Sequence, residues 1–257
     1  MSIIQINNLK KKYSNNYVLQ DINLTIDAGQ IVGYIGPNGA GKSTTIKIIC
    51  GIIDEFEGEV NVLGLDVRRH AIEIKQRIGY IPEQASLYDV LNPTEYLRFV
   101  GKLYGLDDEV IKVKSWELLR LFDLADKSET RMNTYSKGMK QKVLLISGLM
   151  HNPEIIFLDE PLSGLDANAV ILVKEILSQL KQSGKTIFYS SHIMDVVEKI
   201  SDRIVIIDKG EVLADGSFET LQQQAHQGSL ENIFTSLTGG SQQNNSTAKE
   251  FIDILKF

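Results

Sequence analysis

The sequence predicts an α/β fold with a mostly parallel sheet, an antiparallel β subdomain at the N-terminus and an inserted all-helical subdomain. Three observations lead to this prediction. An apolar run at residues 31–35 passes through a glycine-rich turn into a segment that can be helical. Segments typical of strands and helices alternate between residues 155 and 214, as parallel sheets require. Residues 86–152, which separate these two regions, show apolar side chains at helical spacing.

The first 35 residues are predicted to form β structure. Apolar residues at Ile4, Ile6 and Leu9 indicate one strand, and residues 17–26 indicate a second. Ser14-Asn15-Asn16 supplies a turn between them. Residues 31–35 then form an apolar strand. Two further short strands are expected at residues 58–63 and 78–81.

Residues 86–152 are predicted to be helical. Asn92-Pro93-Thr94-Glu95 combines an N-cap residue, a proline at the first helical position and a glutamate placed to reach back to the cap. A second helix is expected over residues 109–122, and a third from Ser136 to Met150. In the second helix we expect one side to carry Val110, Val113, Trp116, Leu119 and Phe122.

The α/β pattern resumes after residue 152. Strands are expected at 155–158, 186–190, 203–207 and 211–214, with helices at 167–181 and 193–200. A nucleotide would lie at the carboxyl ends of such parallel strands. The predicted domains are a core of residues 1–85 and 153–238, a helical subdomain of residues 86–152, and a linker with a tail at residues 239–257.

The turn after residue 35 carries the strongest motif. Gly36, Gly41, Lys42 and Ser43 fit the pattern G-x-x-x-x-G-K-[ST]. Its glycines allow backbone N–H groups and a helix N-terminus to surround phosphates, while the lysine reaches the β- and γ-phosphates and the hydroxyl ligates Mg²⁺. A glycine turn with an ordinary surface lysine is the alternative interpretation. The motif predicts a phosphate-loop NTPase core.

The strand at residues 155–158 leads into two carboxylates, Asp159 and Glu160. In phosphate-loop enzymes an acid at this place holds Mg²⁺, which suits Asp159. Glu160 could orient or deprotonate the attacking water. A pair of acids after a strand can also be a solvated loop, and the phosphate loop upstream favours the catalytic interpretation.

Composition narrows the class of partner and the compartment. A net charge of −6 argues against binding nucleic acid through its phosphates. The single cysteine, Cys50, excludes an internal disulfide and is expected to be a buried thiol. The N-terminus shows no signal-peptide pattern, and the apolar runs are shorter than the ~20 residues that span a bilayer. We therefore expect a soluble, intracellular chain.

Several stretches together resemble the ATP-binding-cassette (ABC) ATPases. Residues 135–141, Tyr-Ser-Lys-Gly-Met-Lys-Gln, resemble the LSGGQ signature, and residues 159–166 resemble the acidic strand end and the D-loop that follows it. Gln84 matches the Q-loop glutamine, His192 the switch histidine, and Tyr13 the aromatic residue that stacks on adenine. The resemblance covers residues 3 to about 237.

This resemblance implies roles for individual residues. The catalytic residues implied are Glu160, His192 and Gln84, and the Mg²⁺ ligands are Ser43, Gln84 and Asp159. The ATP-binding residues implied are Tyr13, Gly36, Asn38, Gly39, Ala40, Gly41, Lys42, Ser43, Thr44, Ser136, Gly138 and Asp166. Structural alternatives exist for some of them: Tyr13 as a strand aromatic, Gln84 as a loop residue, His192 as a neighbour of a helix N-cap, and Asp166 as a helix cap that could also signal.

The signature departs from the family pattern at two positions. Lys137 replaces its first glycine and Met139 its glutamine, while Ser136 and Gly138 remain. Whether Lys137 touches nucleotide stays open. The departure, together with residues 230–238, resembles the ATPase subunits of drug, antibiotic and polysaccharide exporters.

The resemblance implies an ATP-hydrolysing subunit that forms a head-to-tail dimer, with itself or a homologous subunit, around two Mg-ATP molecules. It would drive a separate integral membrane permease from the cytoplasmic side of the cell membrane, with Leu87 and Tyr88 as candidate contacts.

Two alternative functions are open: a non-transport ABC ATPase of translation or DNA repair, and a GTPase or small-molecule kinase. For the tail at residues 250–257, docking on its own domain, a dimer contact and a membrane-surface helix are all open.

Overall fold

The structure is a computed structural model that describes residues 2–84, 87–225, 228–239, 251 and 254. Within this part of the chain, the strands form two sheets. The smaller sheet has the order β2-β1-β4-β5 and the larger has the order β10-β9-β3-β8-β7-β6. The strands are β1 Ser2–Tyr13, β2 Asn16–Asp27, β3 Ile31–Ile35, β4 Glu57–Val62, β5 Leu65–Asp66, β6 Ile78–Ile81, β7 Ile155–Asp159, β8 Thr186–Ser190, β9 Arg203–Asp208 and β10 Glu211–Gly216.

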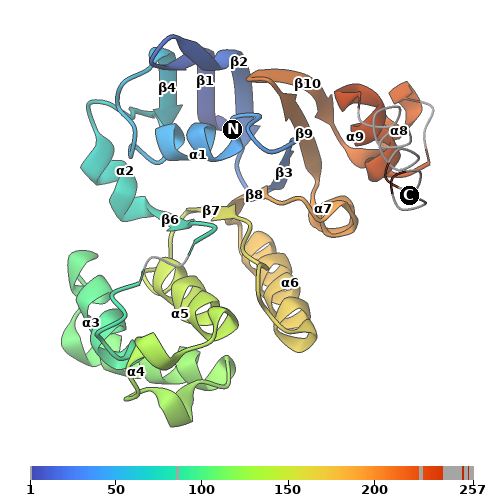
Figure 1. Cartoon of the computed structure of the whole chain (residues 1–257). Coiled ribbons are helices and arrows are strands. Elements are labelled where there is room, and N and C mark those ends of the chain that lie inside the picture. The colour runs from blue at the N-terminus through green and yellow to red at the C-terminus, as the bar shows by residue number, and fades with distance from the viewer. Residues whose placement is uncertain (1, 85–86, 226–227, 240–250, 252–253, 255–257) are drawn as a thin grey trace.

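The helices connect these strands and cover both faces of the larger sheet (Figure 1). They are α1 Lys42–Ile49, α2 Ala71–Arg77, α3 Pro93–Leu103, α4 Asp108–Leu121, α5 Lys137–Leu149, α6 Ala167–Gln182, α7 Met194–Ile200, α8 Phe218–Ala225 and α9 Leu230–Thr238. Short 3-10 turns lie at Ala125–Lys127 and Met132–Thr134. Three of these helices, α2, α8 and α9, were not predicted from the sequence.

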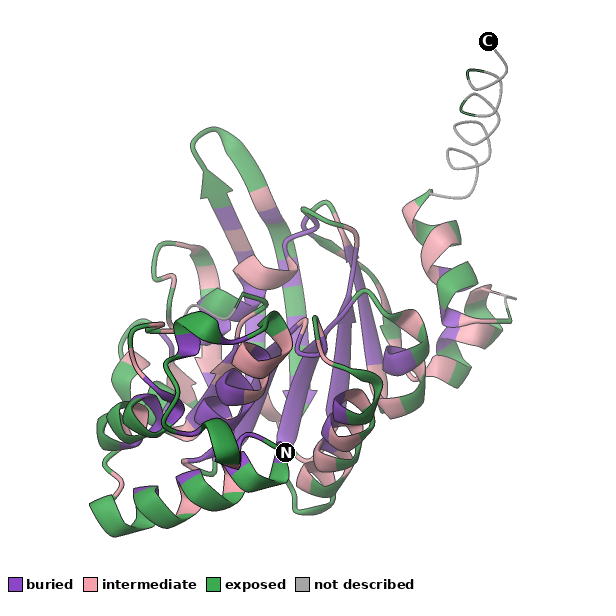
Figure 2. Ribbon diagram, turned by 60° about the horizontal axis from the view of Figure 1, so that its bottom comes forward, coloured by how far each residue is buried: buried purple, intermediate pink, exposed green. Residues whose placement is uncertain are grey.

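The pairing of the strands agrees with the predicted topology. β3, β6, β7, β8 and β9 pair in parallel, and β10 is antiparallel to β9. In the smaller sheet β1 pairs antiparallel with both β2 and β4. The central strands β3, β7 and β8 are buried along their whole length (Figure 2) because helices or the second sheet cover both faces. The carboxyl ends of the parallel strands therefore meet at one edge of a rigid sheet.

Two apolar clusters lie on opposite faces of the larger sheet. On one face, α1 packs between this sheet and the smaller antiparallel sheet, where Ile46, Ile48 and Ile49 are buried with residues of β1 and β2. Cys50 is also buried in this cluster, as predicted, and burial raises the pKa of its thiol. On the other face, residues of α5, α6 and α7 pack together with those of the helical region. The start of α1 is thus held from two sides.

The buried face of α4 differs from the prediction. Val110, Val113 and Trp116 are exposed, whereas Leu119 is buried. The buried face includes Ile111 and Ser115 instead. The predicted set steps by three residues each time, which drifts around a helix of 3.6 residues per turn, so its members do not share one face. Phe122 of that set, which follows the helix, is buried.

Much of the predicted linker and tail lies outside the described residues. Gly239 ends α9 in the left-handed conformation, with φ +74°. Phe251 and Ile254 are exposed. The predictions for the remaining residues of 239–257 fall on positions that the structure does not describe.

Candidate functional site

The glycine-rich loop between β3 and α1 needs its glycines for two physical reasons. Gly39 and Gly41 have φ +82° and +106°, a left-handed conformation that side chains disfavour. A Cβ at Gly36 would lie 2.3 Å from the carbonyl oxygen of Ile207, and one at Gly41 would lie 2.5 Å from a methyl group of Leu19. The loop is therefore packed tightly against β9 and β2, and its backbone is fixed before any ligand arrives.

Lys42 is the cation of this loop. Its Nζ donates hydrogen bonds to the carbonyl oxygens of Gly36, at 2.7 Å, and Pro37, at 3.1 Å. Partial burial lowers the pKa of Lys42, and the carboxylates of Glu160, Asp159 and Glu83 oppose that shift. Because the hydrogen-bond partners are neutral carbonyls, the ammonium charge remains available to an anion.

The first turn of α1 presents hydroxyl groups next to this lysine. Ser43 and Thr44 line the cavity in front of the loop, whereas Thr45 is buried. The Thr45 Oγ1 donates to the carbonyl oxygen of Gly41, at 3.0 Å, and Tyr34 OH donates to Thr45 Oγ1, at 3.2 Å. The first turn carries no acidic residue. The positive end of the helix dipole therefore faces the cavity without a carboxylate of its own to neutralise it.

Two carboxylates face the loop from the end of β7. Asp159 is the last residue of β7 and is 3% exposed. Glu160 adopts φ +52°, which is unusual for a residue with a side chain and stores backbone strain. Its N–H donates to the carbonyl oxygen of Ser190, at 2.9 Å, which holds this conformation on β8.

The loop after β8 contacts Glu160 a second time. His192 Nδ1 lies 2.8 Å from Glu160 Oε2, and Ser191 Oγ donates to the same oxygen at 3.3 Å. The Glu160 side chain is largely buried, whereas the His192 side chain is 72% exposed. The histidine thus connects a fixed carboxylate to the open mouth of the cavity.

These groups surround one cavity of about 520 Å³. It is lined by Val18, Asn38, Gly39, Gly41, Lys42, Ser43, Thr44, Glu83, Asp159, Glu160 and His192. Most of the predicted phosphate-loop and acidic residues therefore meet in one place. Val18 and Glu83 were not predicted as site residues. Val18 has no motif to mark it, whereas Glu83 is adjacent to the predicted Gln84.

Other predicted residues lie outside this lining. Gly36 and Ala40 belong to the loop itself, and Ala40 is buried. Gln84 follows β6 and is exposed. Tyr13 lies at the end of β1, is 47% exposed, and has Lys11 Nζ 5.0 Å from the centre of its ring.

Ser136, Gly138 and Asp166 lie on a separate surface of the same chain. Ser136 caps α5, where its Oγ accepts a hydrogen bond from Met139 N at 3.2 Å. Asp166 caps α6 by accepting one from Ala169 N at 2.9 Å, which agrees with the structural alternative for this residue. A Cβ at Gly138 would lie 2.5 Å from the carbonyl oxygen of Gly164, so α5 begins in direct contact with the loop that leads to Asp166.

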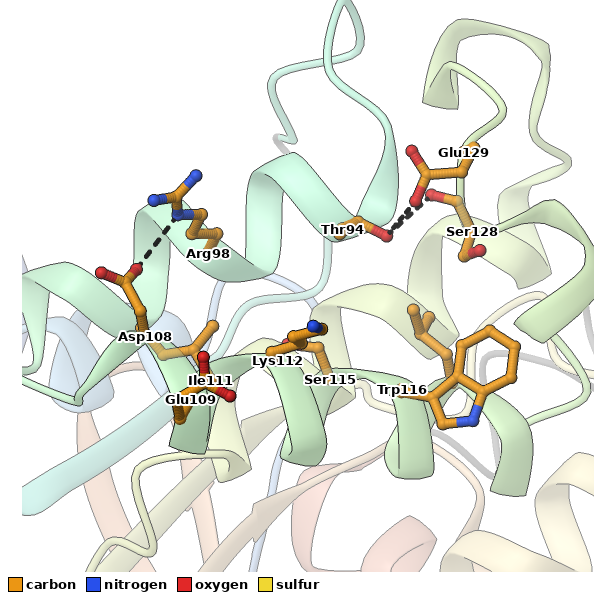
Figure 3. Close-up of a pocket in the computed structure, with 11 residues that line it drawn as sticks. Thr94, Arg98, Asp108, Glu109, Ile111, Lys112, Ser115, Trp116, Ser128 and Glu129 are labelled. Atoms are coloured by element: carbon orange, nitrogen blue, oxygen red, sulfur yellow. Dashed lines mark hydrogen bonds and ion pairs between the residues drawn. The ribbon is translucent and has the colours of Figure 1, made fainter.

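A second cavity, of about 480 Å³, lies between α3 and α4 in the helical region (Figure 3). Arg98 pairs with Asp108 at 3.2 Å, and Thr94 donates to Glu129 at 2.9 Å, across its rim. Trp116 also lines it. No predicted site residue is among its lining residues, so the candidate functional site is the phosphate-loop cavity.

The fold and this cavity define a class of protein: a phosphate-loop nucleotide-binding enzyme with a basic glycine loop facing two acids. The comparison with protein families is more specific. The ABC transporter family model matches residues 19–163, which is more than half of the chain, and the chain belongs to this family.

Relatives agree with this assignment. The chain is 38% identical to the ABC transporter ATP-binding protein NatA of Bacillus subtilis, over 85% of this chain and 89% of that protein. It is 37% identical to the linearmycin resistance ATP-binding protein LnrL of the same organism, over 84% and 69%. It is 31% identical to the daunorubicin resistance ATP-binding protein DrrA3 of Streptomyces coeruleorubidus, over 86% and 70%.

Solved structures agree as well. An ATP-binding subunit of an ABC transporter matches with a TM-score of 0.86 and 32% identity, over 91% of this chain and 99% of that one. An ATP-binding cassette in a dimeric post-hydrolysis state with ADP and Pi matches with a TM-score of 0.78 and 27% identity, over 83% and 98%. The predicted fold, family and ATPase class are confirmed.

Proposed function

We propose that this chain hydrolyses Mg-ATP in a head-to-tail dimer, formed with a second copy or a homologous subunit, and so drives export through a separate membrane permease. The observation that carries the proposal is the separation of two complementary surfaces on one chain. The phosphate-loop cavity holds a lysine and a helix N-terminus, whereas Ser136 and the start of α5 lie on another surface. A second helix N-terminus completes an anion site when another subunit supplies it.

The residues in the cavity suit Mg-ATP. Asp159 and Ser43 offer a carboxylate and a hydroxyl oxygen, which are ligands that Mg²⁺ accepts while it keeps water and phosphate oxygens as its others. Gln84 is proposed as a further ligand. The described residues hold no group of three or more His, Cys, Asp or Glu side chains that could bind a metal without the substrate. When bound, Mg²⁺ would neutralise charge that develops on the phosphates.

Glu160 is proposed to orient or deprotonate the attacking water, and His192 to position Glu160 and contact the γ-phosphate. The 2.8 Å contact between the two side chains supports this division of roles. Tyr13 is proposed to stack on adenine; its exposed ring supports this. The remaining loop residues would surround the phosphates with backbone N–H groups.

The partner and the place of action are also proposals. Among the described residues, no helix has the length and apolar character that a membrane crossing requires. We propose that the chain acts at the cytoplasmic side of the cell membrane through its contact with the permease. Two relatives carry drug or antibiotic resistance in their names, which supports export.

The domain division at residues 1–85 with 153–238, 86–152 and 239–257 remains our proposal as well. It is supported by α3, α4 and α5 packing mainly with one another, apart from the contact of α5 with β6. Such an arrangement lets the helical subdomain turn as a body when nucleotide binds.

The experiment is a test of ATP-dependent dimerisation in the slow variant Glu160→Gln. We expect light scattering to show a monomer with Mg-ADP and a dimer with Mg-ATP. Lys42→Ala in the same background should stay monomeric with both nucleotides. A Glu160→Gln chain that stays monomeric at saturating Mg-ATP, even with its membrane permease present, would contradict the proposal.

A further inference from the structure

The start of α5 and the loop at residues 160–166 contact each other along one continuous surface, which we call the signature seam. On α5 it includes Lys137, Gly138, Gln141 and Lys142, and on the loop it includes Pro161, Ser163, Gly164 and Asp166. The buried Gln141 Nε2 donates to the carbonyl oxygen of Pro161 at 3.1 Å, and Lys142 pairs with Asp166 at 3.5 Å. The loop and the helix therefore have several independent contacts.

Lys137, an exposed residue, makes two further contacts of the seam. Its Nζ donates a hydrogen bond to Ser163 Oγ at 2.7 Å. Its methylene groups cover Gly164, where a Cβ would lie 3.0 Å from both Cγ and Cδ of the lysine. Gly164 has φ +78°, so the loop turns sharply under the side chain. Glycine, which the signature motif usually has at the position of Lys137, has no side chain to reach Ser163.

The contact between Lys137 and Ser163 joins two segments that have different proposed roles. The loop begins at Glu160, which lines the phosphate-loop cavity. The helix begins after Ser136, which is proposed to contact the ATP bound by the other subunit. Lys137 therefore bridges, within one chain, the segment that carries the proposed catalytic carboxylate and the helix that would hold the partner's nucleotide.

We propose that Lys137 is a positioning residue that couples the two ATP sites of the dimer through Ser163. Its ammonium holds Ser163, and with it the loop at 160–166, in register with the start of α5. A change at one subunit's γ-phosphate then moves both the partner's α5 and the loop attached to it. This inference rests on the proposed ATP-driven dimer. In it, Lys137 does not contact nucleotide and affects the ATP sites only through the loop at 160–166.

The test compares Lys137→Met, Ser163→Ala and the double variant. Lys137→Met keeps most of the apolar stem over Gly164 and removes the ammonium group. Ser163→Ala removes only the hydroxyl group that accepts the hydrogen bond from Lys137. Lys137→Arg and Ser163→Thr keep a donor and an acceptor, so they serve as conservative variants. Lys112→Met, which changes an exposed lysine of α4, is the matched control.

We expect both single variants to lower kcat about tenfold with the KM for ATP within about twofold, because a hydrogen bond to a charged group is lost while the nucleotide contacts remain. The double variant should be no slower than either single variant, since both remove the same contact. The Hill coefficient for ATP should fall towards 1 in all three. The conservative variants and Lys112→Met should keep activity and cooperativity.

Two further measurements distinguish a positioning role of Lys137 from direct contact with the partner's nucleotide. In the Glu160→Gln background, Lys137→Met and Ser163→Ala should both still dimerise with Mg-ATP, and amide hydrogen exchange at residues 162–166 should become faster in both. If Lys137→Met prevents dimerisation and Ser163→Ala does not, the lysine binds the partner's nucleotide directly and the inference is wrong. Additive losses, or a Ser163→Ala variant with normal turnover and cooperativity, also overturn it. Failure of the ATP-dependent dimer itself would appear in the Glu160→Gln parent and would count against the proposed function instead.

Discussion

At the scale of single residues, the site depends on Glu160 being held in one orientation. Its left-handed backbone is fixed by the hydrogen bond to Ser190, and its carboxylate is fixed by His192 and Ser191. Strained residues that persist in a fold are common at catalytic positions, where the surrounding contacts compensate for the strain. We therefore propose Glu160, rather than Asp159, as the carboxylate that acts on water.

Glu160→Gln should separate chemistry from binding. We expect hydrolysis to slow by ~10²–10⁴, about 3–5.5 kcal/mol of barrier, because the amide cannot accept the proton from water. Binding of ATP should persist, since Lys42 and the loop are unchanged. Phosphate release measures the first quantity and a fluorescent ATP analogue the second. Turnover close to that of the unmodified chain would remove the catalytic assignment.

Lys42→Ala should have the opposite profile. It removes the cation that lies over the carbonyl oxygens of Gly36 and Pro37 and leaves the facing acids unbalanced. We expect the fluorescent analogue to lose measurable binding at concentrations that saturate Glu160→Gln. Affinity within about twofold of the unmodified chain would mean that this lysine does not contact phosphate.

At the scale of elements, the helical region begins at a well-formed cap. Asn92 Oδ1 accepts from Glu95 N at 2.8 Å, and Glu95 Oε2 accepts from Asn92 N at 2.9 Å. This reciprocal pair at the start of α3 is the arrangement that the Asn-Pro-Thr-Glu spacing predicts. Asp107 at the start of α4 makes no such side-chain bond, although its residue type is equally suited.

The two caps therefore offer a matched comparison. Asn92→Ala should lower the free energy of unfolding by about 1 kcal/mol because the backbone N–H of Glu95 loses its acceptor, Asn92 Oδ1. Asp107→Ala should lower the free energy of unfolding by no more than about 0.3 kcal/mol, since no side-chain cap bond is lost. Urea denaturation measures both. Equal losses would show that the cap geometry of α3 does not contribute.

The junction of α5 with the sheet contains a histidine that is sensitive to pH. His151 stacks on Tyr104 at 3.6 Å between ring centres, and its Nε2 lies 2.9 Å from the carbonyl oxygen of Ile78. Burial, followed by the nearby Lys114 and Lys185, lowers the pKa of His151 below its ordinary value of 6.5. Its Nδ1 is buried without a hydrogen-bond partner, so protonation there would place a charge in an apolar environment.

The lowered pKa of His151 predicts a loss of stability in mild acid. The unfolded chain binds a proton as the pH falls through 6.5, while the folded chain does not until its lower pKa is reached. The free energy of unfolding should therefore decrease over that window and be unaffected by this group above it. His151→Phe keeps a ring on Tyr104 and should have a smaller decrease between about pH 7.5 and about pH 5.5 in urea denaturation. An unchanged pH dependence would contradict this prediction.

At the scale of the whole molecule, α1 is buried between two sheets while the helical subdomain extends from the other face (Figure 1). The segment before α3 exposes Tyr88, whose ring meets Phe99 edge to face at 5.7 Å. Tyr88, together with Leu87, is the candidate permease contact that the family resemblance implies. Two exposed aromatic rings in contact form an apolar surface suited to a protein partner.

A double substitution of Tyr88 and Phe99 by serine should reduce co-purification of the membrane permease at least tenfold, because two large apolar side chains leave the interface. Nucleotide binding should be unchanged, since neither residue lines the phosphate-loop cavity. Trp116→Ser, which changes another exposed aromatic residue of the helical subdomain, is the control and should bind normally. Normal co-purification of the double variant would place the permease contact elsewhere.

The features that the sequence predicted are those whose residues are close together in the chain. The phosphate loop, the acids after β7 and the α3 cap each occupy a few consecutive positions, so their local geometry depends on short-range backbone preferences. The alternation of strands and helices likewise predicted the parallel sheet. The roles assigned to the individual site residues, including Tyr13 and Gln84, remain predictions.

Only the tertiary structure decided which distant residues meet. Spacing assigned Val113 and Trp116 to the same side of α4 as Leu119, but packing against α3 and α5 buries Ile111 and Ser115 instead. Val18 lines the cavity without a motif to mark it, and Lys137 reaches Ser163 across 26 positions of sequence. The physical reason is the same in each case: local spacing fixes which way a side chain leaves its own element, whereas its neighbours depend on how the elements pack, and packing is a property of the whole chain.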